Sequence, residues 1–461
     1  MLEDILYDKQ CFFETGMQSV LRGQENRVRK VVLQQGNLVV NDRSEENGIC
    51  AKVYKNGVSG FASMADYSDE AAKMVLKAAT ENAEYLYKYA QKRKNALPGL
   101  PGGQMKSERF IIDFEQKRII DLVHTIDDHV VKTYPKLTSR SVIYREDTME
   151  KIIYTSDAKN GHVAYPRVAV YVILNMQSKD GKPLELVQGF GGFGHMEDHF
   201  TDLTGVYEGI DKLYQQLCDK AEGVYAKAGV KTVILDSEVA GMIAHEAVGH
   251  TVEADLVIGG SVAGPNLGRQ VASDIVSIVD YAHTSFGKQT ALPVYLDDEG
   301  VEAKDAVLVE NGILKGFMHN RETAAHFGVE PCGNARGWGF SDEPLIRMRN
   351  TAVLPGKDKL EDMIASVEDG YYLLNTNNGQ ADLTGEFMFG ICMGYEIKHG
   401  KLGKAILDTT VSGVAFDMMK TVDMVSDEIK WSSFGTCGKK QPMAVAMGGP
   451  AIKCQITIGG R

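Results

Sequence analysis

Two histidines and a glutamate lie together between His245 and His250, a combination that can bind a divalent metal and hydrolyse a bond. In the usual helical zinc motif the histidines are four residues apart and share one face of the helix. Here they are five apart, which on a straight helix turns the second imidazole about 140° from the first. A metal site therefore requires a local distortion, and Gly249 is well placed for a kink or π-turn. The alternative is a buried, alanine-rich helix whose two histidines have ordinary hydrogen-bond partners.

The residues before the first histidine predict a buried helix. Asp236 is suited to cap its N-terminus, and Glu238 adds an acidic side chain to the first turn. Apolar residues then cover nearly the whole circumference, namely Val239, Ala240, Met242, Ile243, Ala244, Ala247 and Val248. Buried polar groups need partners, and a divalent cation would satisfy the two histidines and the glutamate together. Glu253 and Asp255 follow closely enough to orient an imidazole from behind the metal.

The segment His245–Asp255 resembles the metal motif of the TldD/PmbA family of metallopeptidases, once described as modulators of DNA gyrase. Further segments resemble the family in the same order: 297–300, 310–316, 347–351, 354–357, 379–382 and 435–439. The N-terminal half resembles the family mainly in its layout. Because the chain keeps the full motif, the resemblance implies an active, TldD-like member that cleaves short or unfolded peptides. It also implies a homodimer, or a heterodimer with a related member.

A catalytic zinc with tetrahedral coordination takes three protein ligands, so the helix needs a third ligand from elsewhere. The chain has seven cysteines. Cys454 lies in a predicted terminal strand, where a cysteine is usually a small buried apolar residue. By spacing alone, Cys332 in a Pro-Cys-Gly-Asn segment rivals Cys437 in a Gly-Thr-Cys-Gly loop. The resemblance favours Cys437, and the predicted site is one Zn²⁺ per active subunit on His245, His250 and Cys437.

Glu246, next to the first histidine, is the predicted general base, which would take a proton from the attacking water and pass it to the leaving amine. Three residues are candidates for a second oxyanion donor, and the sequence does not distinguish them: Arg336, Arg347 and His319. Gly379 and Gln380 belong to a polar stretch that either lines the substrate path or forms a plain surface turn. His195 and His199 have the four-residue spacing of a helical metal pair. They follow a glycine-rich stretch without an apolar helix, and we interpret them as solvated loop residues.

Two other functions fit the same residues. The chain could be a non-catalytic partner subunit whose metal site is structural, with Asp255 or Glu253 as a fourth protein ligand. It could also be a binding module for a protein such as gyrase, in which case its activity would survive the loss of Glu246.

The predicted fold class is α+β, with an N-terminal α/β-layer region followed by a strand-rich C-terminal domain that carries the metal-binding helix. A chain of 461 residues is expected to form two or three domains. We predict an N-terminal α+β domain over 1–100, a middle α+β region over 104–228 and a β-rich metallopeptidase domain over 229–461. The boundary between the first two is a Pro/Gly-rich stretch at 97–103.

Composition predicts a cytoplasmic enzyme that binds neither membrane nor nucleic acid. No stretch approaches the roughly 18 apolar residues of a membrane span, and the first residues lack the pattern of a signal peptide. The seven cysteines lack the tight spacing of a disulfide framework, which favours a reducing compartment. A net charge of −12, without a long basic cluster, argues against direct nucleic-acid binding.

Overall fold

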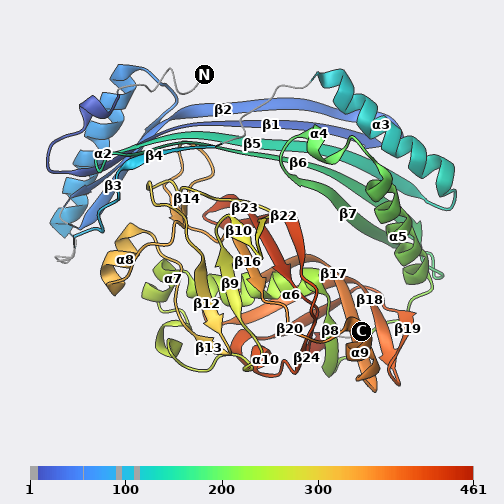
Figure 1. The fold of residues 1–461 in the computed structure, drawn as a ribbon. Coiled ribbons are helices and arrows are strands. Elements are labelled where there is room, and N and C mark those ends of the chain that lie inside the picture. Colours follow the sequence, from blue (N-terminus) through green and yellow to red (C-terminus); the bar gives the residue numbers. More distant parts are fainter. Residues whose placement is uncertain (1–8, 56, 90–95, 108–114, 460–461) are drawn as a thin grey trace.

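The computed structural model describes residues 9–55, 57–89, 96–107 and 115–459. Its N-terminal part is a seven-stranded sheet in the order β3-β2-β1-β5-β6-β4, with β7 also paired to β6. The strands are β1 (Gln18–Gln34), β2 (Asn37–Lys55), β3 (Val58–Met64), β4 (Gly103–Lys106), β5 (Ser139–Thr155), β6 (Lys159–Gln177) and β7 (Pro183–Phe193). All neighbours are antiparallel except β4 and β6. The long strands form an arch over the C-terminal part (Figure 1).

Helices pack at the two ends of this arch (Figure 1). At one end α2 (Asp69–Tyr89) buries its alanine-rich face against β2 and β3, so closely that a Cβ on Gly60 would lie 2.1 Å from the Ala79 carbonyl oxygen. At the other end, α3 (Gln116–Thr133) contacts β1 and β5, and α5 (Thr204–Ala221) contacts β6 and β7. The short helices η1 (Lys9–Phe12) and α4 (Met196–His199) complete this part.

The C-terminal part contains two larger sheets with a helix between them. The six-stranded sheet has the order β13-β12-β9-β16-β23-β22, and the seven-stranded sheet has the order β17-β8-β24-β20-β18-β19, with β21 beside β24. The helix α6 (Ser237–Ile243) contacts β16, β22 and β23 of one sheet and β8 and β17 of the other. Apolar residues of this helix and of both sheets form one continuous buried core. The segment predicted to carry the metal motif is therefore held on two sides.

The strands of the six-stranded sheet are β9 (Ile278–Tyr281), β12 (Ala306–Glu310), β13 (Ile313–Leu314), β16 (Asn350–Val353), β22 (Lys430–Lys439) and β23 (Gln441–Gly449). Those of the seven-stranded sheet are β8 (Gly229–Leu235), β17 (Asp369–Ala381), β18 (Glu386–Lys398), β19 (Lys401–Ala405), β20 (Thr409–Val414), β21 (Met424–Val425) and β24 (Ile452–Gly459). Two small hairpins are β10 (Thr284–Ser285) with β11 (Lys288–Gln289), and β14 (Ala335–Arg336) with β15 (Leu345–Ile346). The remaining helices are α7 (Ala254–Ile258), η4 (Gly264–Asn266), α8 (Arg321–Phe327), α9 (Leu360–Ala365) and α10 (Ala415–Lys420).

The predicted α+β class and the strand-rich C-terminal region are confirmed. The predicted domain boundary at 97–103 stays a prediction. Strands from before and after that stretch lie in one sheet. The stretch is also packed rather than free, because Arg321 donates hydrogen bonds to the Pro98 carbonyl oxygen. No helix in the described part of the chain combines the length and the apolarity needed to cross a bilayer.

Buried ion pairs join the N-terminal sheet to the C-terminal part. Asp298 accepts hydrogen bonds from Arg22 of β1 and Lys151 of β5, at 2.5 and 2.8 Å. Glu299, the next residue, accepts from Lys52 and Tyr54 of β2, at 3.0 and 2.6 Å. All of these side chains are buried, so removing one partner would leave an uncompensated charge inside the protein.

Candidate metal centre

The helix that carries the motif begins where the sequence predicts. Asp236 caps α6, because its carboxylate accepts the backbone N–H groups of Glu238 and Val239, both at 3.1 Å. The apolar side chains that follow are buried against the two sheets. A capped and enclosed helix gives the next turn little freedom to move.

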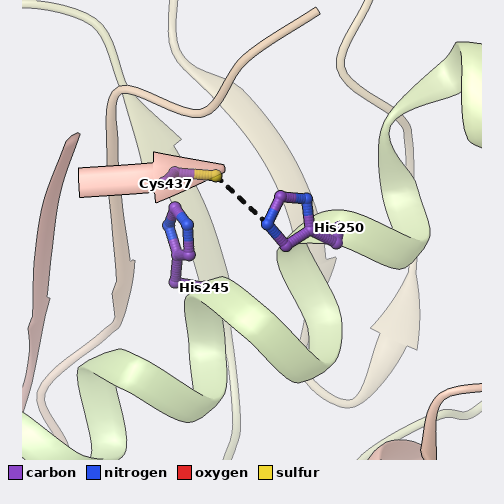
Figure 2. Close-up of side chains that lie close together, drawn as sticks. All are labelled: His245, His250 and Cys437. Carbon is purple, nitrogen blue, oxygen red and sulfur yellow. Dashed lines mark hydrogen bonds between the residues drawn. The ribbon is translucent and has the colours of Figure 1, made fainter. Parts of the chain in front are cut away.

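That next turn is a π-helix, η2 (Ala244–Gly249), followed by a short 3₁₀ turn, η3 (His250–Val252). Its hydrogen bonds run five residues back, and the N–H of His250 donates to the carbonyl oxygen of His245. Residues five apart therefore share a face. The imidazole rings of His245 and His250 lie 5.2 Å apart and nearly perpendicular, both directed toward the same space (Figure 2). The predicted distortion is present.

Gly249 has a different role from the predicted one. Its backbone is ordinary right-handed helix, with φ −55° and ψ −49°, so no special conformation requires glycine. Space does require it: a Cβ at this position would lie 2.1 Å from the Met348 sulfur and 3.2 Å from the Ala244 carbonyl oxygen. Gly249 thus allows close packing of the π-turn.

Cys437 approaches the two histidines from strand β22, where it pairs with Met443 of β23. Its sulfur lies 3.2 Å from Nε2 of His250, and one ligand atom from each of the three residues falls within 4.8 Å of the others (Figure 2). The sequence places Cys437 in a loop, whereas it lies in a strand just beyond an irregularity between Ser432 and Gly435. The rival Cys332 lies outside this cluster, with its sulfur 3.9 Å from the Phe317 carbonyl oxygen.

The state of His245 fits a metal ligand. Its side chain is 1% exposed, and neither ring nitrogen has a hydrogen-bond partner among the residues that the structure describes. Burial, reinforced by the charges of His250 and Arg347, moves the pKa of His245 well below its usual value, which keeps the imidazole neutral. A neutral imidazole with two unpartnered buried nitrogens is costly unless a cation binds it.

His250 is oriented from behind by a carboxylate. Its Nδ1 lies 2.8 Å from Glu253, a fully buried side chain, which leaves Nε2 directed at Cys437. Burial lowers the pKa of His250, but Glu253 and Cys437 together raise it well above its usual value. A carboxylate in this position fixes the ring orientation of a metal-binding histidine.

Lys439 joins this carboxylate to the strand that carries the sulfur. Its ammonium lies 3.3 Å from Glu253 and 2.8 Å from Asp255, and it donates to the Ile346 carbonyl oxygen at 3.1 Å. Asp255 thus contacts a lysine rather than an imidazole. No residue type or spacing around Lys439 indicates this contact. Strand alternation alone would place Lys439 on the same face as Cys437, two residues away.

Glu246 faces the same space as the two imidazoles. Its carboxylate oxygens lie 4.0 Å from Nε2 of His245 and 3.6 Å from Nε2 of His250, and its side chain is 19% exposed. Burial is the main cause that raises the pKa of Glu246. The carboxylate is therefore partly shielded but still accessible to a water molecule.

Two of the three candidate oxyanion donors, Arg347 and His319, are engaged in other contacts. Arg347 is fully buried and donates to the carbonyl oxygens of Cys437 and Gln441, so it supports the β22–β23 hairpin from within. Nδ1 of His319 lies 3.2 Å from Oγ1 of Thr323, and the ring packs against Phe327. Burial lowers the pKa of His319 to about 4. In the described residues, Arg347 reaches Cys437 only at its backbone, and neither Arg347 nor His319 forms a hydrogen bond with the side chain of a candidate ligand.

Other singled-out residues lie apart from the cluster. Gly379 and Gln380 are exposed on β17, paired with β18. Nε2 of His199 lies 3.0 Å from the Phe193 carbonyl oxygen, and the backbone N–H of His195 donates to Asp198. Neither histidine belongs to a metal-binding group in the described part of the chain.

Two family models match the chain and cover its first strands and its C-terminal part. Residues 228–460 match the model of the PmbA/TldA metallopeptidase C-terminal domain, and residues 20–83 match that of PmbA/TldA metallopeptidase domain 1. The chain belongs to the PmbA/TldD metallopeptidase family. The resemblance inferred from the sequence is thereby confirmed.

Several relatives of this PmbA/TldD protein are similar over most of their length. The zinc metalloprotease TldD homolog of Saccharolobus solfataricus is 30% identical over 350 residues, covering 75% of this chain and 76% of that protein. The metalloprotease TldD homolog of Haemophilus influenzae is 31% identical over 352 residues, covering 75% of this chain and 72% of that protein.

Two solved structures share the fold of this PmbA/TldD protein. One is a candidate modulator of a DNA gyrase from Thermotoga maritima, with TM-score 0.76, 19% identity and full coverage of both chains. The other is TldE from Thermococcus kodakarensis, with TM-score 0.74, 17% identity and 99% coverage of both chains.

We predict that Glu253→Gln weakens zinc binding by about 10–100-fold, because an amide holds the His250 ring less firmly than a carboxylate does. Competition with a chelator measures the affinity. Glu310→Gln is the matched control, since Glu310 is an exposed partner of Lys315. An unchanged affinity in Glu253→Gln would show that this contact does not support the ligand.

We predict that Gly249→Val lowers metal retention more than global stability, because the side chain would displace Met348 and the π-turn. Metal content after dialysis and the denaturation midpoint are the two measurements. Gly205→Val is the control, since a Cβ there meets nothing within 4 Å. Full metal retention in Gly249→Val would contradict the packing role.

Proposed function

We propose that the protein is a zinc-dependent peptidase that hydrolyses short or unfolded peptides, with Glu246 as the general base. The convergence of His245, His250 and Cys437 beside this carboxylate is the observation that carries the proposal. Two imidazoles and a thiolate form a ligand set suited to zinc, and three protein ligands leave one position for chemistry. The relative from Saccharolobus solfataricus, which is named a zinc metalloprotease, supports the same choice of metal.

Glu246 moves the protons in this reaction. A zinc ion held by the three ligands would polarise the scissile carbonyl and acidify a water molecule. From its position near both Nε2 atoms, Glu246 takes the proton of that water and passes it to the leaving amine. Glu253 and Lys439 keep His250 in place while this happens.

Two strand edges near the candidate metal centre suit an extended peptide. Strand β22, which carries Cys437, is the last strand of its sheet. Strand β17 pairs with β8 only up to Leu373, whereas its pairing with β18 continues to Ala381. The edge of β17 on the β8 side therefore has no neighbouring strand over residues 375–381 in the described part of the chain. This stretch includes Gly379 and Gln380. A peptide that adds to such an edge is held by main-chain hydrogen bonds with little side-chain selectivity.

The alternative of a structural metal site has less support. A structural zinc needs a fourth protein ligand, and Glu253 and Asp255 were the candidates for it. Both are engaged elsewhere, Glu253 with the far nitrogen of His250 and with Lys439, and Asp255 with Lys439. We therefore favour a catalytic site over a non-catalytic, gyrase-modulator-like subunit. We further propose a cytoplasmic enzyme that pairs with itself or with a related family member and does not bind nucleic acid directly.

We predict that Glu246→Gln abolishes cleavage of an unstructured peptide, by at least about 100-fold, and leaves zinc content unchanged. Metal analysis and a peptide-cleavage assay of the same preparation measure both effects. Glu310→Gln again serves as the control and should keep full activity. Cleavage that persists in Glu246→Gln would refute the assignment of the base.

We predict that compact folded proteins are spared, because a peptide must be extended to reach a strand edge beside the metal. The test compares cleavage of one protein in its folded form and in a permanently unfolded form, at equal concentration, with Glu246→Gln as the blank. Equal rates on the two forms would rule out the requirement for an extended substrate.

A further inference from the structure

A small cavity lies between the N-terminal sheet and the C-terminal part. Strands β5 and β6 line one side through Lys151, Tyr165 and Arg167, while Asp298, Arg336 and the β23 residue Met443 line the other. Its free volume of about 30 Å³ has room for one or two water-sized atoms. The cavity is separate from the metal ligands, none of which lines it.

Positive charge exceeds negative charge around this cavity. Each of its two carboxylates is already shared between two cations: Asp298 between Arg22 and Lys151, at 2.5 and 2.8 Å, and Asp147 between Arg145 and Arg167, at 2.7 and 3.2 Å. The lining itself holds three cations, Lys151, Arg167 and Arg336, against these two carboxylates. This local excess contrasts with the net charge of −12 for the whole chain.

Arg336 is the cation without a counter-charge. It is 8% exposed, and its only hydrogen bond to the described residues runs from Nη1 to the Met348 carbonyl oxygen, at 2.7 Å. No carboxylate of the described residues forms an ion pair with it. The nearby Asp280 is already paired with Arg349, at 2.9 Å. Burial lowers the pKa of Arg336 to about 10, which still leaves it charged at neutral pH.

A buried guanidinium without a counter-charge destabilises a fold, and water can satisfy its N–H groups but not its charge. We propose that the cavity binds one small anion, either chloride or the head of a small carboxylate, with Arg336 as its anchor. Arg336 has Nε and Nη2 available for this contact, whereas Lys151 and Arg167 are committed to carboxylates and carbonyl oxygens. The bound anion stabilises the contact between the N-terminal sheet and the C-terminal part.

The test measures thermal unfolding of the full chain at constant ionic strength, with sodium gluconate replaced stepwise by sodium chloride or by sodium acetate. Gluconate is too large for the cavity. The wild-type protein should show a rise in Tm that grows with the logarithm of the anion concentration and reaches about 3 °C at a hundredfold excess of anion over its Kd. Arg336→Met, which fills the space without charge, should lose this rise. Arg118→Met, which removes an exposed arginine paired with Glu197, should keep it.

Line broadening of ³⁵Cl in the NMR spectrum tests binding without unfolding, and Arg336→Lys provides a charged variant if the methionine variant folds poorly. Broadening that acetate reverses, and that is weaker in Arg336→Lys, supports one site for both anions. A response to only one of the salts supports the proposal and identifies the ligand. The absence of both a rise in Tm and a line broadening in the wild-type protein, or equal responses in Arg336→Met, would overturn it.

Discussion

One wide turn of helix determines where the chemistry can take place. In the π-turn from Ala244 to Gly249, the N–H of His250 donates to the carbonyl oxygen of His245, five residues back, and this places the two histidines on one face. An α-helical turn would point the second imidazole elsewhere. The turn is held between a capped helix and two sheets, with Met348 packed against Gly249. The position of both histidines therefore depends on the surrounding core.

The third ligand comes from a strand 187 residues further along the chain, so its position must be fixed separately. A buried cation and a half-buried cation do this from different directions. Arg347 binds the carbonyl oxygens of Cys437 and Gln441 within the hairpin, and Lys439 links that hairpin to Glu253 behind His250. Rigid placement of this kind allows a metal site to form without a large rearrangement of its ligands.

The sequence predicted the parts of the site that depend on local pattern. The helix cap at Asp236 and the need for a distorted turn followed from residue spacing, and the α+β class followed from strand and helix patterns. The expectation that Gly249 is needed for its backbone freedom was wrong. Glycine is needed there because of the close approach of Met348, which is a tertiary contact. Likewise, no local pattern shows that Lys439 meets Glu253, or that strands on both sides of residues 97–103 join one sheet. The choice of Cys437 over Cys332 depended on the family resemblance, not on spacing.

The π-turn also makes the site sensitive to the number of residues between its two histidines. A five-residue histidine spacing is the four-residue spacing with one residue added, and the π-turn accommodates that residue while both imidazoles keep one face. Deleting one residue between them would shift the helix that Asp236 caps relative to the turn that Glu253 and Lys439 hold, so one of these two supports would lose its contacts. The spacing of the motif and the contacts on either side of it therefore form a matched set.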